Sequence, residues 1–218
     1  MNVHEIIILL IYTVLFILVL SICEFLYRKY HPPVETTRKI AHVMASTASI
    51  GFVYTLESHW CVLLLAVVFS GILYWGKKSG KLKAIDHVER ETYGSILIPL
   101  GIYCSFLIGE KTHSQEAFIL SMLILGFADP VAAVSGMYAQ KRGINKKLIF
   151  EKTFVGSLFF FITSLGLSWL ALHYLHVNNA FNLALKMAVL LTGVELLSPN
   201  GSDNLTVPVA TSFAYILL

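Results

Sequence analysis

The run EIIILLIYTVLFILVLSICEFLY, from Glu5 to Tyr27, decides the class of fold that this chain adopts. Its interior, from Ile6 to Cys23, carries no charged side chain, and a helix of about 20 apolar residues is long enough to cross a bilayer. The run lacks a basic leader and a small-residue cleavage site, so we expect it to remain as a permanent transmembrane span.

The composition of the whole chain points the same way. Its 218 residues are 56% hydrophobic and 13% charged, whereas soluble domains carry about 25% charged residues. Within a bilayer each backbone polar group must be paired inside the protein, which favours helices. We therefore predict an all-α, polytopic membrane helix bundle in which 1–218 form a single integral membrane domain. Cys23, Cys61 and Cys104 lie in apolar runs and are interpreted as packing residues.

Apolar runs predict about seven transmembrane helices. They are placed near 5–27, 40–57, 59–76, 93–110, 116–139, 154–174 and 182–198. The remaining tail, 205–218, is too short to cross a bilayer, so we expect a half-helix that returns into the bundle.

Basic residues gather in alternate loops. The loops after the first, third and fifth spans hold 14 of the 16 lysines and arginines. Because positively charged loops stay in the cytoplasm, the N-terminus is predicted to lie outside. Four polar clusters, 35–42, 129–143, 152–157 and 195–204, then share the cytoplasmic face.

Asp129 is the ionisable residue of the apolar run 118–134. A carboxylate at membrane depth usually marks a functional site. Pro130 follows it, and proline suits the first position of a helix capped by aspartate. We expect a broken helix here, with a new helical start that reaches into a site. A proline kink with a self-capping aspartate is the simpler alternative.

Basic side chains near helix starts predict a phosphate site. Lys152, Thr153 and Gly156 open the sixth span, where free backbone N–H groups bind anions. Arg38 can grip phosphate oxygens with two hydrogen bonds. His42 lies one helical turn beyond Arg38 and can donate to a phosphate or shuttle a proton. Positive-inside anchoring is the alternative explanation for these basic residues.

Carboxylates suggest a bound cation. Mg²⁺ takes carboxylate oxygens together with substrate phosphates, and Asp129, Glu195 and Asp203 are the candidate ligands. Capping of the last helix by Asp203 or Asn204 is an alternative that does not account for Glu195. The sequence contains no Walker loop, protein-kinase motif set or Rossmann fingerprint.

Taken together, the motifs resemble the family of dolichol kinases, phytol kinases and CTP-dependent diacylglycerol kinases. In chain order they are Glu35-x-x-Arg38-Lys39-x-x-His42, Glu89-Arg90-x-x-Tyr93-Gly94-Ser95, Asp129-x-x-Ala132-x-x-x-Gly136, Lys152-Thr153-x-x-Gly156-Ser157, and Glu195 through Asp203-Asn204-x-x-x-Pro208. The resemblance implies phosphorylation of a lipid alcohol (polyprenol, dolichol, phytol or diacylglycerol) with CTP, less favourably ATP, and with Mg²⁺ as cofactor. Nucleic acid is not an expected partner, and the expected location is a prokaryotic inner membrane with the site facing the cytoplasm.

The resemblance also implies roles for individual residues. The expected catalytic residues are Asp129, Asp203, Lys152 and His42. The expected nucleotide- and phosphate-binding residues are Arg38, Lys39, Lys152, Thr153, Gly136, Gly156, Asn204 and Arg90. The expected metal ligands are Asp129, Glu195 and Asp203.

Two other functions are compatible with parts of the sequence. A phosphatidate cytidylyltransferase also uses CTP, but the His-Gly-Gly and Asp-Arg-x-Asp elements of that family are absent from the sequence. A non-enzymatic lipid or anion carrier also contains broken helices with anion-binding ends, although carriers place their sites near the midplane and usually show inverted repeats.

Overall fold

The computed structural model describes residues 3–86, 92–144 and 148–217, and within these ranges the chain is helical without strands. The elements are α1 (Val3–Tyr30), α2 (Val34–Ser49), α3 (Phe52–Thr55), α4 (His59–Ser79), α5 (Lys83–Asp86), α6 (Gly94–Lys111), α7 (Gln115–Leu123), η1 (Ile124–Ala128), α8 (Asp129–Lys141), η2 (Ile149–Glu151), α9 (Phe154–Tyr174), α10 (Ala180–Leu197) and α11 (Asp203–Leu217). The predicted all-α membrane bundle is confirmed.

Six helical segments of the described chain are long and apolar enough to cross a membrane. They correspond to six of the seven predicted spans. The remaining predicted span, 40–57, is not among them. Its first part belongs to α2, which begins earlier, at Val34, and ends at Ser49. With 16 residues it is shorter than a typical span of about 20 residues. Its buried residues include Arg38, Lys39 and His42, so this helix brings charge into the bundle.

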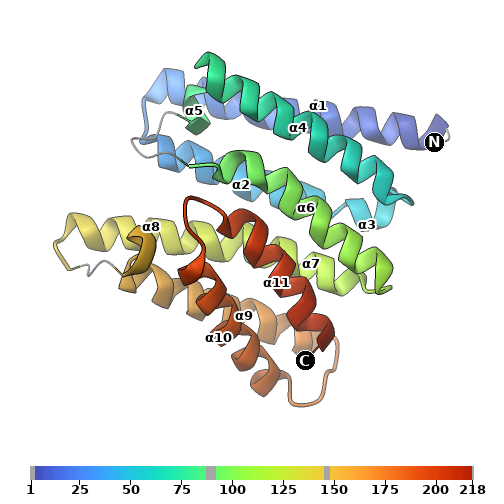
Figure 1. Cartoon of the computed structure of the whole chain (residues 1–218), viewed down its shortest axis with the longest axis vertical. Coiled ribbons are helices and arrows are strands. Elements are labelled where there is room, and N and C mark those ends of the chain that lie inside the picture. Colours follow the sequence, from blue (N-terminus) through green and yellow to red (C-terminus); the bar gives the residue numbers. More distant parts are fainter. Residues whose placement is uncertain (1–2, 87–91, 145–147, 218) are drawn as a thin grey trace.

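The C-terminal helix α11 is the expected short helix. Its 15 residues reach about 22 Å at a rise of about 1.5 Å per residue, less than the roughly 30 Å of a hydrocarbon core. It packs against α6, α7 and α10. Figure 1 shows the C-terminus toward the same end of the bundle as the N-terminus, while the C-terminal ends of α1, α4, α8 and α10 lie toward the other end.

The predicted break at Asp129 is wrong. The backbone of Asp129 is itself helical, and residues 115–141 run on as one helical segment through η1. A proline in a regular α-helix clashes with the carbonyl four residues earlier, which here belongs to Gly126. The π-turn of η1 widens the helix at that point, so Pro130 is accommodated without a break. Asp129 therefore points from the side of a continuous helix rather than capping a new one.

Close packing at η1 positions α2 beside this helix. A Cβ atom added at Gly126 would lie 3.0 Å from the Cβ of Ser46, so the glycine allows a near approach of the two backbones. Ser46 follows His42 by one helical turn, and both are buried. The same face of α2 therefore meets the Asp129 segment along its length.

Candidate functional site

Asp129 is the centre of a buried polar contact between α2 and α8. Lys39 Nζ donates to Asp129 Oδ2 at 2.5 Å, and both side chains are about nine-tenths buried. His42 Nδ1 lies 3.3 Å from the same carboxylate oxygen. Since α2 starts at Val34, Lys39 and His42, three residues apart, follow each other on one face of its first three turns. Arg38, on the neighbouring face, is bound by Glu35 at 2.6 Å.

Lys152 forms a second charged group. Its Nζ lies 2.6 Å from Glu195 Oε1 and 2.5 Å from Asp203 Oδ2. Burial lowers the pKa of this ammonium, but the neighbouring carboxylates of Asp203 and Glu195 more than offset the effect, so the pKa of Lys152 stands above its ordinary value. The Ser157 hydroxyl, from α9, also contacts Glu195 Oε2, at 3.3 Å. One lysine thus links α10 with the start of α11.

The two charged groups line one pocket with a cavity volume of about 640 Å³. Its charged lining residues are Arg38, Lys39, Lys152, Glu35, Asp129, Glu195 and Asp203. Thr153, Gly136, Gly156 and Asn204 complete the wall among the residues expected to bind nucleotide. The structure therefore gathers side chains from all four polar clusters of the sequence into one place.

Glycines bring α8 and α9 together at the base of this pocket. A Cβ atom at Gly136 would lie 2.6 Å from Thr153 Oγ1, which is closer than real Cβ contacts allow. Thr153 Oγ1 in turn accepts a hydrogen bond from Gly156 N–H and caps the start of α9. The expected phosphate-binding residues Gly136, Thr153 and Gly156 thus have a packing role that the structure shows directly.

The segment before α6 holds the Asp203 loop in place. Tyr93 N–H and Thr92 Oγ1 both donate to the carbonyl of Asn200, at 3.1 Å each. Asn204 Nδ2 donates to the carbonyl of Gly94 at 2.9 Å. The motif around Tyr93 therefore connects α6 to the loop that presents Asp203.

One expected site residue lines another pocket, and one falls outside the described residues. His42 touches Asp129 but lines a different, apolar pocket. Arg90 lies outside the described residues. Sequence reasoning gave no role to Glu35 or Ser157, although both stand inside the quoted motifs. For Glu35 the sequence carries a signal. Glu35 lies three residues before Arg38 on a helix, a spacing at which opposite charges can pair.

The three expected metal ligands do not form one cluster. In the described part of the chain, no three histidine, cysteine or acidic side chains are grouped as a metal site. Asp129 is paired with Lys39, whereas Glu195 and Asp203 meet around Lys152. Of the three expected metal ligands, Glu195 and Asp203 are the two that share a basic partner in the described structure.

These features define an integral membrane protein with a charged pocket between its helices. A phytol kinase from Synechocystis sp. (strain ATCC 27184 / PCC 6803 / Kazusa) is 26% identical over 195 residues, which cover 87% of this chain and 82% of the relative. This similarity supports the resemblance to the phytol kinase family, to which the chain is distantly similar. No family model and no solved structure matches the chain.

Proposed function

We propose that this protein transfers a phosphoryl group from CTP to the hydroxyl group of a membrane lipid alcohol. The observation that carries the proposal is Lys152 held between two carboxylates at the start of α9, within the charged pocket. A lysine beside a helix start suits a phosphate. The likeness to a phytol kinase over most of the chain supports an alcohol as acceptor.

Phosphoryl transfer depends mainly on positioning and on neutralising charge. In the proposed reaction, Arg38, Lys39 and Lys152 bind the phosphate oxygens of the nucleotide. The start of α9, where Thr153 caps the Gly156 N–H, adds the N-terminal end of a helix, which favours anions. Asp129 holds Lys39 and His42 in position. The donor set of the pocket thus suits a polyphosphate.

The charge balance of the pocket supports a cation as a further partner. Its lining carries three basic side chains, Arg38, Lys39 and Lys152, against four carboxylates. A polyphosphate without a counterion would meet a surplus of negative charge. Mg²⁺ is usually held by one or two carboxylates together with substrate phosphates, and Glu195 and Asp203 fit that role. The ion would neutralise charge on the transferring phosphate.

The location follows from the basic loops. Described basic residues gather at the C-terminal ends of α1, α4 and α8 and at the start of α9, toward the end of the bundle at which α10 also ends (Figure 1). We place that side in the cytoplasm of a prokaryotic inner membrane, where CTP and Mg²⁺ are available.

The test is nucleotide turnover by the purified protein in nanodiscs. CTP or ATP is supplied with Mg²⁺, a panel of lipid alcohols and, separately, phosphatidic acid. Release of CDP with a phosphorylated alcohol is the expected result. Release of pyrophosphate with phosphatidic acid would instead establish a cytidylyltransferase. Passage of lipid phosphate across proteoliposomes without nucleotide turnover would establish a carrier.

A further inference from the structure

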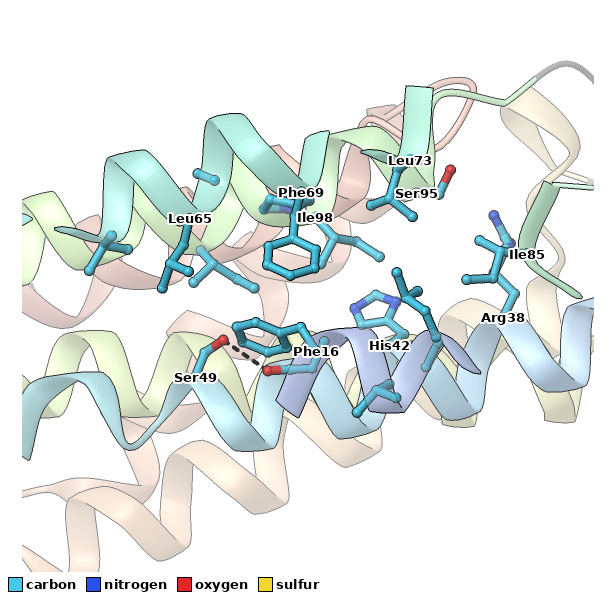
Figure 2. A pocket seen from close by; sticks show the side chains of 18 of the residues that line it. Phe16, Arg38, His42, Ser49, Leu65, Phe69, Leu73, Ile85, Ser95 and Ile98 are labelled. Carbon is cyan, nitrogen blue, oxygen red and sulfur yellow. Dashed lines mark hydrogen bonds between the residues drawn. The ribbon is translucent and has the colours of Figure 1, made fainter. Parts of the chain in front are cut away.

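A second, apolar pocket lies between α1, α2, α4 and α6 (Figure 2). Its walls are mainly aliphatic and aromatic side chains, among them Phe16, Leu65, Phe69, Leu73, Ile98 and Ile102. Figure 2 shows Arg38 and Ser95 toward one end of this pocket and Leu65 toward the other, with the ring of His42 between them. The pocket is thus a mainly apolar cavity with Arg38 and Ser95 toward one end, while Ser49, whose hydroxyl donates to the Ala45 carbonyl, lies toward the other.

His42 and Arg38 connect this pocket to the charged one. Arg38 lines both pockets. The imidazole of His42 is 2% exposed, and its Nδ1 lies 3.3 Å from Asp129, which lines the charged pocket. A ligand at this end of the apolar pocket would therefore lie next to the residues proposed to bind phosphate.

The other ring nitrogen of His42 lacks a partner. Nε2 is buried without a hydrogen bond to any described residue. Buried polar atoms are normally hydrogen-bonded, and leaving one unpaired is costly. If Nδ1 carries the hydrogen toward the Asp129 carboxylate, Nε2 of the neutral ring is an acceptor. An alcohol hydroxyl is a donor of matching kind.

From these observations we infer that the apolar pocket holds the hydrocarbon chain of the lipid alcohol, with its hydroxyl group bound to His42 Nε2. This inference rests on the proposed function and extends it, because it places the acceptor and sets its orientation. The hydroxyl lies at the Arg38 end, beside the charged pocket, and the chain extends along α4 toward Leu65. His42 is a substrate-binding residue in this arrangement.

The dimensions of α4 turn the inference into a test of chain length. Leu73 and Leu65 are eight residues apart on this helix, which corresponds to about 12 Å at a rise of about 1.5 Å per residue. Short alcohols bound at His42 would end before Leu65, whereas long ones would pass it. A bulky residue at the far end should therefore discriminate between substrates by length.

The experiment measures kinase kinetics with a series of alcohols of increasing chain length. Leu65→Trp is compared with Leu64→Trp, a matched control because Leu64 is 47% exposed on the outer side of the same helix. Leu65→Trp should raise KM about 10-fold for long alcohols, with KM for CTP and for short alcohols unchanged. Leu64→Trp should behave as the wild type. Leu65→Phe serves as a milder filling variant if the tryptophan prevents folding.

The hydroxyl end is tested separately with His42→Ala. This variant should raise KM for alcohols of every length, because the lost contact is with the group that they share. Equal effects of Leu65→Trp on all lengths, or an unchanged KM in His42→Ala, would overturn the inference.

A binding measurement separates this inference from the proposed function. An alcohol with a photoactivatable chain is cross-linked to the wild-type protein, and the labelled residues are identified by mass spectrometry. Labelling at Phe69 or Ile98 without turnover of any nucleotide would support the pocket but refute the kinase. Turnover with labelling confined to the outer face of α4 would support the kinase and refute the pocket.

Discussion

The Lys39–Asp129 pair gives the sharpest prediction, because it joins a structural role to a proposed catalytic one. Both side chains are about nine-tenths buried and their atoms are 2.5 Å apart. Asp129→Asn removes this negative charge and leaves the buried Lys39 ammonium with Glu35 Oε1, 4.0 Å away, as its more distant partner. Breaking a buried ion pair in this way costs about 3–5 kcal/mol. The variant should therefore lose stability as well as activity.

A double variant separates the two effects. In Lys39→Gln/Asp129→Asn both charges are gone and two neutral amides can hydrogen-bond, so most of the lost stability should return. Activity should stay absent, because Lys39 no longer binds phosphate and Asp129 no longer orients His42. Stability is measured by unfolding in mixed detergent–SDS micelles, and activity by release of CDP. Arg28→Gln is the control, since Arg28 is 69% exposed in its pair with Glu24 and such pairs contribute about 0.3–0.5 kcal/mol.

Two outcomes would refute this reasoning. An Asp129→Asn protein as stable as the wild type would mean that the ion pair does not stabilise the fold. A double variant that recovers activity along with stability would mean that Asp129 acts through folding alone. In either case the charged pocket would need another catalytic centre.

Three further predictions concern the same pocket. Lys152→Met should raise KM for CTP about 10-fold or more, since a charge-assisted phosphate contact is lost. Because the substitution frees Glu195 and Asp203, the variant should also bind Mg²⁺ alone more tightly than the wild type in calorimetric titration. Weaker Mg²⁺ binding by the variant would contradict the roles assigned to these residues. Gly136→Ala should destabilise the protein, because the added Cβ would lie 2.6 Å from Thr153 Oγ1. Gly166→Ala is the matched control: a Cβ there meets open space, so this variant should stabilise the protein by about 0.5–1 kcal/mol. Thermal unfolding measures both changes. The pKa of Lys152 is raised above its ordinary value. The stabilisation from its charge is therefore fully present below the ordinary lysine pKa and is lost only as pH rises through the raised pKa. The free energy of unfolding measured between about pH 6 and pH 9 should show no decrease assignable to Lys152.

The sequence was sufficient to predict most of the helices, because apolar runs of sufficient length have few other stable forms. It was less informative about α2. There the charged residues Arg38 and Lys39 favour a helix boundary, whereas the helix starts before them, at Val34, and carries them into the bundle. Hydropathy identifies helices that face lipid. A helix that is enclosed by other helices can carry charged residues and is missed by this criterion.

The outcome at Pro130 has a different cause. Proline disrupts a regular α-helix, so a break was the expected result. The actual result depends on whether the preceding turn can widen, and η1 does so beside α2. Whether the helix breaks or widens at Pro130 therefore depends on packing between segments that are distant in the sequence. The same is true of the Lys39–Asp129 contact, whose partners are 90 residues apart in the chain.

The ion pairs of the charged pocket give a reason for its surplus of carboxylates. Lys39 and Lys152 would be costly to bury alone, and each is neutralised by acidic partners in the protein without ligand. A phosphate that binds Lys152 must compete with Glu195 and Asp203. Once displaced, these two carboxylates would lose their counterion and, in the proposed reaction, would be free to bind a divalent cation. The nucleotide and its metal ion should therefore bind together far better than either does alone, because each removes the charge that the other leaves unpaired.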